Sequence, residues 1–320
     1  PRRLRRARRA RARALRDTLG TARTAAPALR RRYSKLCDVA DFADPAFRAR
    51  AAELRPDLDL DWAFDRKTWE FTMLALLLEE RGLLDGRARM LSVGAGREAI
   101  LFWLAPRIGR LVAVDIYGRG EFAGSEAPAA MLDDAASLSP YPDLSTERLE
   151  VRNMDARSLD FGDASFDCVF SLSSIEHFGA PGDIRRAAAE IGRVLRPGGI
   201  AYVVSELQLR AARPPRRALQ AAARAASGGR LSRREVFTET ALERDVIEAS
   251  GLELLQPLDT TMSEASFDNL AVRRFGRLHT RSGRFHPHIV LRVRGETFTS
   301  VGLALGRRLE PGRPARATAT

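Results

Sequence analysis

Two glycines and one aspartate form the pattern with the clearest chemical meaning in this chain. The apolar run 90–93 breaks at Gly94 and Gly96, and a second apolar run ends at Asp115, about twenty residues later. Glycines leave the backbone of a turn open to a ligand, and a carboxylate at the end of the next strand can accept hydrogen bonds from both hydroxyls of a ribose. These residues therefore predict a site for a ligand that contains adenosine.

Three further segments follow the glycine turn in a fixed order. Residues 151–156 end a predicted strand with Asp155, and residues 165–171 form a strand that is entered through Phe166 and Asp167. Residues 193–199 close a helical pattern with Pro197, Gly198 and Gly199. In order and spacing, the series resembles the class I S-adenosylmethionine-dependent methyltransferases, and within them the small-molecule, type 11-like branch. The resemblance covers about residues 88–205 well and extends weakly to residue 305. Each segment alone is a weak signal, but their shared order is specific.

The resemblance implies a role for each residue of the pattern. Gly94 and Gly96 would leave room for the methionine part of the cofactor, S-adenosyl-L-methionine. Asp115 would bind the ribose and Asp155 the adenine amino group, although an ordinary acid at a strand end stays the alternative for both. The cofactor-binding residues that the resemblance implies are Gly94, Ala95, Gly96, Glu98, Asp115, Ile116, Met154, Asp155, Ala156, Ser171 and Leu172.

Two positions depart from the family pattern. Ser92 stands where the family usually has an acid, and Glu98 stands where it often has a third glycine. The acid helps to hold the ammonium group of the cofactor, and Glu98 could supply that charge from the other side of the turn. A helix N-terminus also tolerates an acid well, so helix capping alone could explain Glu98.

His177 and Glu176 are the candidate catalytic residues, because they directly follow the predicted fourth strand. An imidazole there could remove a proton from an acceptor hydroxyl during methyl transfer, since its pKa lies near neutral pH. The alternative is that both residues brace the loop through hydrogen bonds to backbone. Methyl transfer depends mainly on an in-line approach of the acceptor, so positioning could supply much of the rate.

Neither a metal site nor a set of disulfides is expected. Asp268, His286 and His288 fit no standard spacing of metal ligands. The two cysteines, Cys37 and Cys168, are too few for a disulfide framework or a zinc site. A reducing, cytoplasmic setting fits this cysteine usage.

The net charge of +12 is concentrated at the N-terminus. Residues 1–32 hold thirteen arginines and one acid, Asp17, so the remaining residues carry no net charge. Such a segment could make weak contact with anionic lipid or nucleic acid, or it could be a solvated extension. No apolar run is long enough to cross a bilayer, and no secretory pattern follows the basic start, so a cytoplasmic protein is expected.

The elements that must position these residues alternate between apolar runs and helical patterns. This alternation predicts an α/β fold: a Rossmann-like, doubly wound sheet of seven strands, mostly parallel with one antiparallel strand, plus N-terminal helices. The predicted strands are 90–93, 111–115, 149–152, 167–172, 199–205, 252–257 and 298–305. The main predicted helices are 67–81, 97–105, 182–195 and 239–250.

Four regions are predicted along the chain. They are an Arg-rich tail over 1–35, a helical segment or lid over 36–88, a methyltransferase domain over 89–310 and a disordered tail over 311–320. Two insertions, 206–237 and 259–286, are expected on the acceptor side. The oligomeric state stays open.

The resemblance implies methyl transfer to a small molecule or a glycan precursor, with oxygen as the expected acceptor atom and Ser171–Ser174 between the sulfonium and the acceptor. A nucleic-acid methyltransferase recruited by the basic tail stays an alternative. Enzymes that methylate base amines carry an Asn/Asp-Pro-Pro-aromatic motif where Ser171–Ser174 stand, so no specific nucleic-acid partner is expected. An NAD-dependent oxidoreductase would need a fuller glycine pattern, and a non-catalytic scaffold would have no need of Gly94, Gly96 and Asp115.

Overall fold

The computed structural model describes residues 29–211, 236–268, 270–274, 277–280, 288–293 and 295–308. Most of the predicted Arg-rich tail, most of the insertion predicted at 206–237, His286 and the tail predicted at 311–320 lie outside the described residues. From Arg32 onward, the chain forms one unit. The predicted helical segment 36–88 therefore belongs to the same unit as the sheet.

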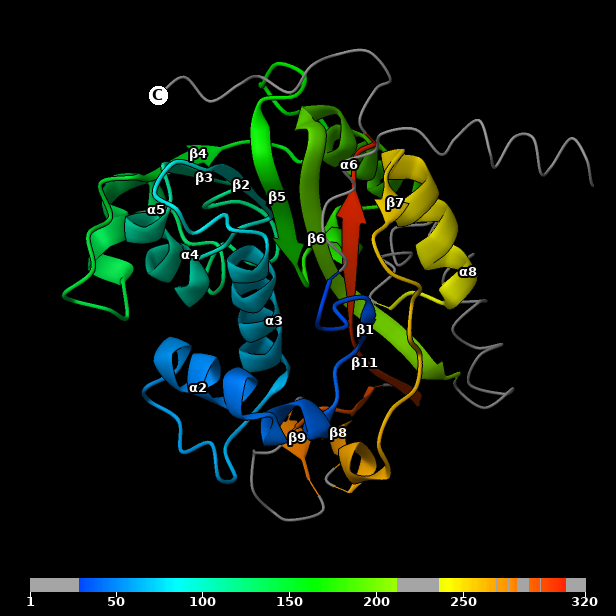
Figure 1. Ribbon diagram of the computed structural model, residues 1–320. Helices are drawn as coiled ribbons and strands as arrows, with labels where there is room; N and C mark the ends of the chain where they lie inside the picture. Colours follow the sequence, from blue (N-terminus) through cyan, green and yellow to red (C-terminus); the bar gives the residue numbers. More distant parts are fainter. Residues whose placement is uncertain are drawn as a thin grey trace, which may run out of the picture. The chain divides into compact units, whose positions relative to one another are not determined.

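Five parallel strands form the centre of the sheet (Figure 1). They lie in the order β4-β3-β2-β5-β6, and each neighbouring pair is parallel. Met90, Leu91 and Val93 of β2 are buried, as expected of a central strand that is covered on both faces. The predicted Rossmann-like, mostly parallel sheet is confirmed. The bounds are β2 (Arg89–Val93), β3 (Arg110–Asp115), β4 (Leu149–Asn153), β5 (Phe166–Leu172) and β6 (Leu195–Arg210).

Six further strands complete the sheet. β11 pairs antiparallel with β6, the order continues through β10, β8 and β9, and β1 and β7 also pair with β11. The described residues thus form an 11-stranded sheet, where the sequence predicted seven strands. β8 and β9 lie in segment 259–286, whose sequence has no clear strand pattern. Such short strands are defined by their pairing partners rather than by hydrophobic alternation, so the sequence did not predict them. The bounds are β1 (Lys35–Leu36), β7 (Glu253–Leu254), β8 (Ala271–Arg274), β9 (Arg277–His279), β10 (Leu291–Val293) and β11 (Glu296–Gly306).

β6 and β11 extend beyond the end of β5. The pairing of β5 with β6 stops at Leu172 and Val204, whereas the pairing of β6 with β11 continues to Arg210 and Thr297. The predicted strands 199–205 and 298–305 contain only part of these two elements. The extension places residues of both strands past the carboxyl end of β5, where the parallel strands direct their loops.

Helices cover both faces of the sheet. α6, α8 and the π-helix η5 lie on one face, where Ile184 and Val246 share a buried core with Leu91 of β2. α4 packs against β3 and α2. No helix within the described ranges is both long and apolar enough to cross a membrane. The bounds are η1 (Val39–Ala43), α2 (Pro45–Leu54), α4 (Ala99–Leu104), η2 (Ala105–Arg107), α5 (Ala130–Asp134), η3 (Ala135–Leu138), η4 (Ile175–His177), α6 (Pro181–Val194), α8 (Glu239–Leu242), η5 (Glu243–Glu248) and η6 (Glu264–Phe267).

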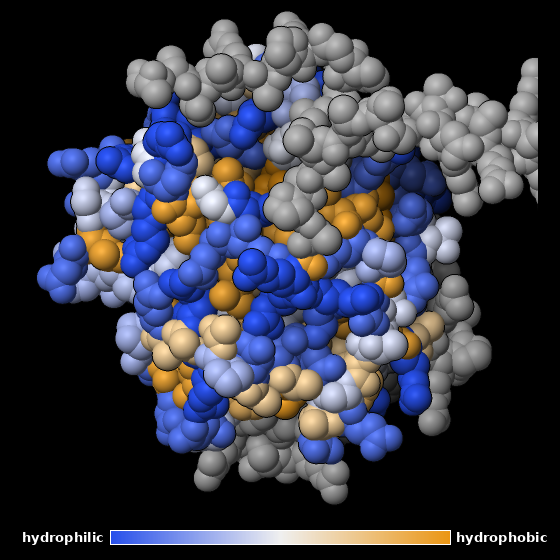
Figure 2. Space-filling view, viewed as in Figure 1, coloured by the Kyte–Doolittle hydropathy of each residue, from blue (hydrophilic) through white to orange (hydrophobic). Residues whose placement is uncertain are grey.

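α3 (Arg66–Glu80) is the longest helix of the N-terminal segment. Its first turn is capped by Asp65, whose carboxylate accepts a hydrogen bond from the Thr68 backbone N–H at 2.8 Å. Trp69 and Met73 are fully buried, and α3 packs against α2 and β11. From the same side as Figure 1, Figure 2 shows hydrophilic side chains with apolar patches between them where α3 stands. The cap and the apolar face fix the start of α3 beside the sheet.

Candidate active site

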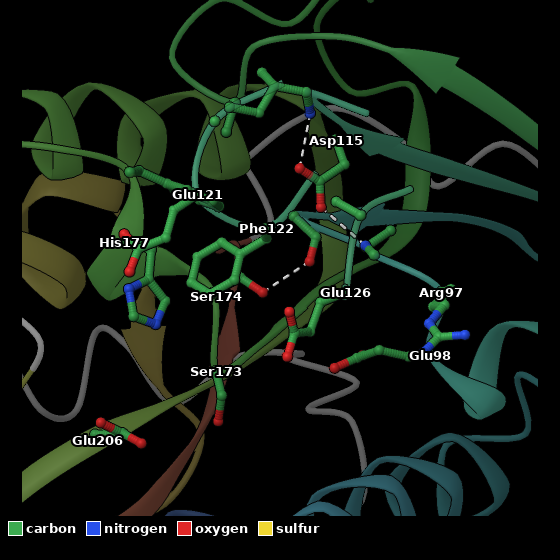
Figure 3. Close-up of a pocket in the computed structure, with 18 of the residues that line it drawn as sticks. Arg97, Glu98, Asp115, Glu121, Phe122, Glu126, Ser173, Ser174, His177 and Glu206 are labelled. Carbon is green, nitrogen blue, oxygen red and sulfur yellow. Dashed lines mark hydrogen bonds between the residues drawn. The ribbon is translucent and has the colours of Figure 1, made fainter. Parts of the chain in front are cut away.

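A cleft of about 830 Å³ lies at the carboxyl ends of β2, β3, β4 and β5 (Figure 3). The carboxyl edge of a parallel sheet is the usual place for ligands in this architecture, because the loops after the strands converge there. Most of the predicted cofactor-binding residues line this cleft, namely Gly94, Ala95, Gly96, Glu98, Asp115, Ile116, Met154, Asp155 and Ala156. The fold therefore brings together segments that are far apart in the sequence.

The glycine turn has a backbone that only glycine adopts easily. Gly94 and Gly96 have φ values of +68° and +51°. A Cβ atom on Gly94 would lie 2.6 Å from the Cβ of Ser174, and a Cβ on Gly96 would lie 2.8 Å from the Glu126 carbonyl oxygen. The backbone N–H groups of Gly94 and Ala95 both donate to the Val114 carbonyl of β3. The turn is thus fixed to the sheet and has no room for a side chain.

Asp115 holds its carboxylate in place with two backbone hydrogen bonds (Figure 3). One oxygen accepts from the Gly96 N–H at 2.9 Å and the other from the Ile116 N–H at 2.7 Å. Burial raises the pKa of Asp115, although both backbone donors act in the opposite direction. A carboxylate has about four acceptor positions, so each oxygen can accept a further bond from a ligand.

Asp155 lines the cleft with its carboxylate bound to a neighbouring arginine. Arg157 donates through Nε to both oxygens, at 2.8 and 3.0 Å, and also contacts Asp183 at 3.3 Å. Hydrogen bonds from Arg157 lower the pKa of Asp155. The carboxylate is therefore charged, and its predicted role toward adenine stays a prediction.

Glu98 occupies the N-cap position of α4, but its side chain makes no capping hydrogen bond. Helix capping is therefore not its role in this structure. Its carboxylate binds the ammonium group of Lys67, which comes from the first turn of α3. Burial raises the pKa of Glu98 to about 7, although Lys67 opposes this shift. Sequence reasoning did not identify Lys67, and the only signal was the rarity of lysine in this chain.

The predictions for Ser171 and Leu172 need correction. Both side chains are buried within β5 and are not among the residues that line the cleft. The strand ends at Leu172, so the next two residues, Ser173 and Ser174, reach the cleft instead. Ser173 has a left-handed backbone with a φ of +51°, and its hydroxyl donates to Glu70 at 2.7 Å.

His177 and Glu176 are neighbours in the 3-10 turn η4, but only the first of them lines the cleft. His177 lines the cleft, and its ring lies edge-on to Phe122 with centroids 4.9 Å apart. Figure 3 shows the side chains of His177 and Glu121 pointing toward one another. Glu176 is fully buried outside the cleft lining, where it accepts a hydrogen bond from the Ser205 hydroxyl at 2.8 Å. The prediction that Glu176 is catalytic is therefore corrected, because its carboxylate cannot reach a ligand in the cleft.

We expect Glu176 to make folding stability depend on pH. Burial raises the pKa of this carboxyl group to about 8, with a further contribution from Glu206. The folded protein therefore keeps a proton on Glu176 that the unfolded chain releases above its ordinary pKa of 4.5. Stability from this group is lost as the pH rises toward 8, by up to about 1.4 kcal/mol per pH unit.

Thermal unfolding of Glu176→Gln between pH 5 and 8 tests this expectation. Glutamine keeps the shape but does not titrate, so the decline of stability with pH should be shallower than in the wild type. Glu190→Gln is the matched control, because the Arg193 side chain lowers the pKa of Glu190 and places its titration below this range. Equal slopes for the wild type and Glu176→Gln would show that Glu176 is already ionised in the folded protein.

Comparison with known proteins identifies a domain that supplies part of the lining of the cleft. Residues 91–203 match the family model described as a methyltransferase domain. The solved structure of the YcgJ protein from Bacillus subtilis is 17% identical and covers 74% of this chain and 98% of its own, with a TM-score of 0.46. A SAM-dependent methyltransferase from Methanosarcina mazei is 18% identical over 72% of this chain and 96% of its own, with a TM-score of 0.42. The [4+2]-cyclase SpnF is 24% identical, and the match spans 57% of each chain with a TM-score of 0.41.

Proposed function

We propose that this chain is a class I S-adenosylmethionine-dependent methyltransferase that methylates an oxygen atom of a small molecule in the cleft, because residues 91–203 match a methyltransferase domain. The observation that supports this proposal is the continuity of the cleft. The same cavity joins the glycine turn to apolar side chains from β10 and β11. One part can therefore hold the cofactor while the other holds an acceptor.

The residues of the first part fit S-adenosyl-L-methionine, which supplies an electrophilic methyl group on a sulfonium when bound. Gly94 and Gly96 line the cleft without side chains, so a ligand can approach their backbone closely. Asp115 presents a fixed carboxylate that would accept from the ribose hydroxyls.

The second part of the cleft has four apolar side chains in its walls, beside the charged side chains of Arg66, Glu206 and Arg273. Phe71, Leu291, Val293 and Phe298 line it, and the Arg66 guanidinium lies 5.5 Å from the centroid of the Phe298 ring. Apolar walls with a few placed polar groups are typical of sites for small organic molecules. A small molecule with an apolar body therefore suits this part better than a glycan precursor, whose surface is largely hydroxyl groups.

Ligand stabilisation provides the first test of this function. S-adenosylhomocysteine should raise the thermal unfolding temperature of the wild-type protein, because a ligand that binds only the folded state stabilises it by mass action. NAD should have no such effect. Stabilisation by NAD alone would instead support an oxidoreductase. A panel of hydroxylated small molecules, assayed with methyl-labelled cofactor, would then identify the acceptor.

We expect His177→Asn to slow methyl transfer to a hydroxyl acceptor by about 100-fold or more at neutral pH. The reason is that His177 lines the cleft and would accept the hydroxyl proton as the methyl group is transferred. Single-turnover rates measure this effect. Affinity for S-adenosylhomocysteine, measured by calorimetry, should not change. A joint loss of thermal stability and of that affinity would instead make His177 a brace of the loop.

A further inference from the structure

Lys67 is exceptional in this sequence. The chain contains 51 arginines but only two lysines, Lys35 and Lys67. Both lysines form ion pairs, Lys35 with Asp41 at 2.7 Å and Lys67 within the cleft. A lysine ammonium is a compact charge with three donors, which fits acceptors that converge on one point better than a planar guanidinium does.

Three acceptors surround the Lys67 ammonium group. They are the Glu98 carboxylate, the Leu172 carbonyl at 3.1 Å and the second carboxylate oxygen of Glu70 at 3.2 Å. Lys67 therefore connects the start of α3 with the start of α4 and the end of β5. Its side chain is 42% exposed, and both Lys67 and Glu98 line the cleft.

The three acceptors differ in what they could offer to a ligand. Glu70 is buried, and its first oxygen already accepts from the hydroxyls of Ser173 and Ser300, so it needs Lys67 as a counter-ion. Glu98 follows the glycine turn directly and makes no capping bond, so its carboxylate is available to a cation in the cleft. A carboxylate that binds the ammonium of Lys67 and lines the cleft can also bind the ammonium of a ligand there.

We propose that Lys67 and Glu98 bind the amino-acid end of the cofactor, an inference that rests on the proposed function. That end carries an ammonium and a carboxylate on the same carbon atom. Glu98 takes the ammonium of the ligand, while Lys67 keeps its contacts with Glu70 and the Leu172 carbonyl and turns toward the carboxylate of the ligand. One internal ion pair is thus exchanged for two ion pairs with the ligand.

The proposal is tested with two ligands that differ only in this end. S-adenosylhomocysteine carries the amino-acid group, whereas 5′-methylthioadenosine has the same adenosine and thioether without it. Calorimetry on Lys67→Met should show an affinity for S-adenosylhomocysteine that is about tenfold or more below that of the wild type, as expected for the loss of a charged hydrogen bond. Affinity for 5′-methylthioadenosine should be unchanged. Glu98→Gln, which keeps the shape of the side chain, should show the same selective loss.

Lys35→Met is the matched control, because it makes the same change in the other lysine, which does not line the cleft. It should leave both affinities unchanged, and thermal unfolding checks that each variant is folded. If Lys67→Met does not fold, Glu98→Gln decides the question. An equal loss for both ligands, or a loss for neither, would overturn the proposal. A wild-type protein that binds neither ligand would instead contradict the proposed function.

Discussion

Replacing Gly94 by alanine is expected to remove measurable binding of S-adenosylhomocysteine. The new Cβ would lie 2.6 Å from the Ser174 Cβ and 2.8 Å from the ring of Phe178, so the turn must move. The movement would break the hydrogen bond from the Ser174 hydroxyl to the Gly94 carbonyl, which is 2.7 Å long. Alanine at a φ of +68° also costs about 1–2 kcal/mol, before any clash is counted. Calorimetry measures the binding, and thermal unfolding measures the loss of stability.

Gly82→Ala separates the backbone cost from the clash. Gly82 follows α3 with a φ of +65°, nearly the value at Gly94, but nothing beyond its chain neighbours lies within 4 Å of its would-be Cβ. This control should lower stability by the backbone cost alone and leave ligand affinity unchanged. The difference between the two variants in stability and in ligand affinity then measures the effect of the steric clash at Gly94. Normal affinity in Gly94→Ala would mean that the cofactor does not lie against this turn.

The centre of the fold could be predicted because its signals are local. β2, β3 and β5 are short apolar runs between turn residues, and burial on both faces requires such a run. β8, β9 and β10 are three or four residues long, and they are strands because of the partners they meet. The extensions of β6 and β11 likewise stabilise each other across about ninety residues of sequence. A pattern within one segment cannot reveal such distant pairing.

The same distinction separates the predicted site residues from those that were missed. Gly94, Gly96 and Asp115 could be identified because backbone conformation and strand position determine what they do. Lys67 reaches the site only because α3 packs against the sheet, and no spacing rule relates it to Glu98, 31 positions away. His177 and its neighbour Glu176 show a further limit. Adjacent residues in a 3-10 turn point in different directions, so the sequence could not tell which of the two lines the cleft.

Asp115→Ala should weaken the binding of S-adenosylhomocysteine by roughly 10- to 150-fold. This range corresponds to about 1.5–3 kcal/mol, the usual contribution of a hydrogen bond to a charged group. Truncation would leave the ribose hydroxyls without their acceptor, and the backbone N–H groups of Gly96 and Ile116 without their present partner. Calorimetry with both S-adenosylhomocysteine and 5′-methylthioadenosine measures the effect. The two ligands share the ribose, so both affinities should fall by the same factor.

This equal loss distinguishes the ribose site from the amino-acid site. Asp115→Ala should affect both ligands alike, whereas Lys67→Met should affect only the ligand that carries the amino-acid end. Asp61→Ala provides the control for removal of a carboxylate, because the Asp61 side chain is 81% exposed and does not line the cleft. It should change neither affinity. If Asp115→Ala bound both ligands as tightly as the wild type does, Asp115 would not bind the ribose. The proposed orientation of the cofactor along the strand ends would then be wrong.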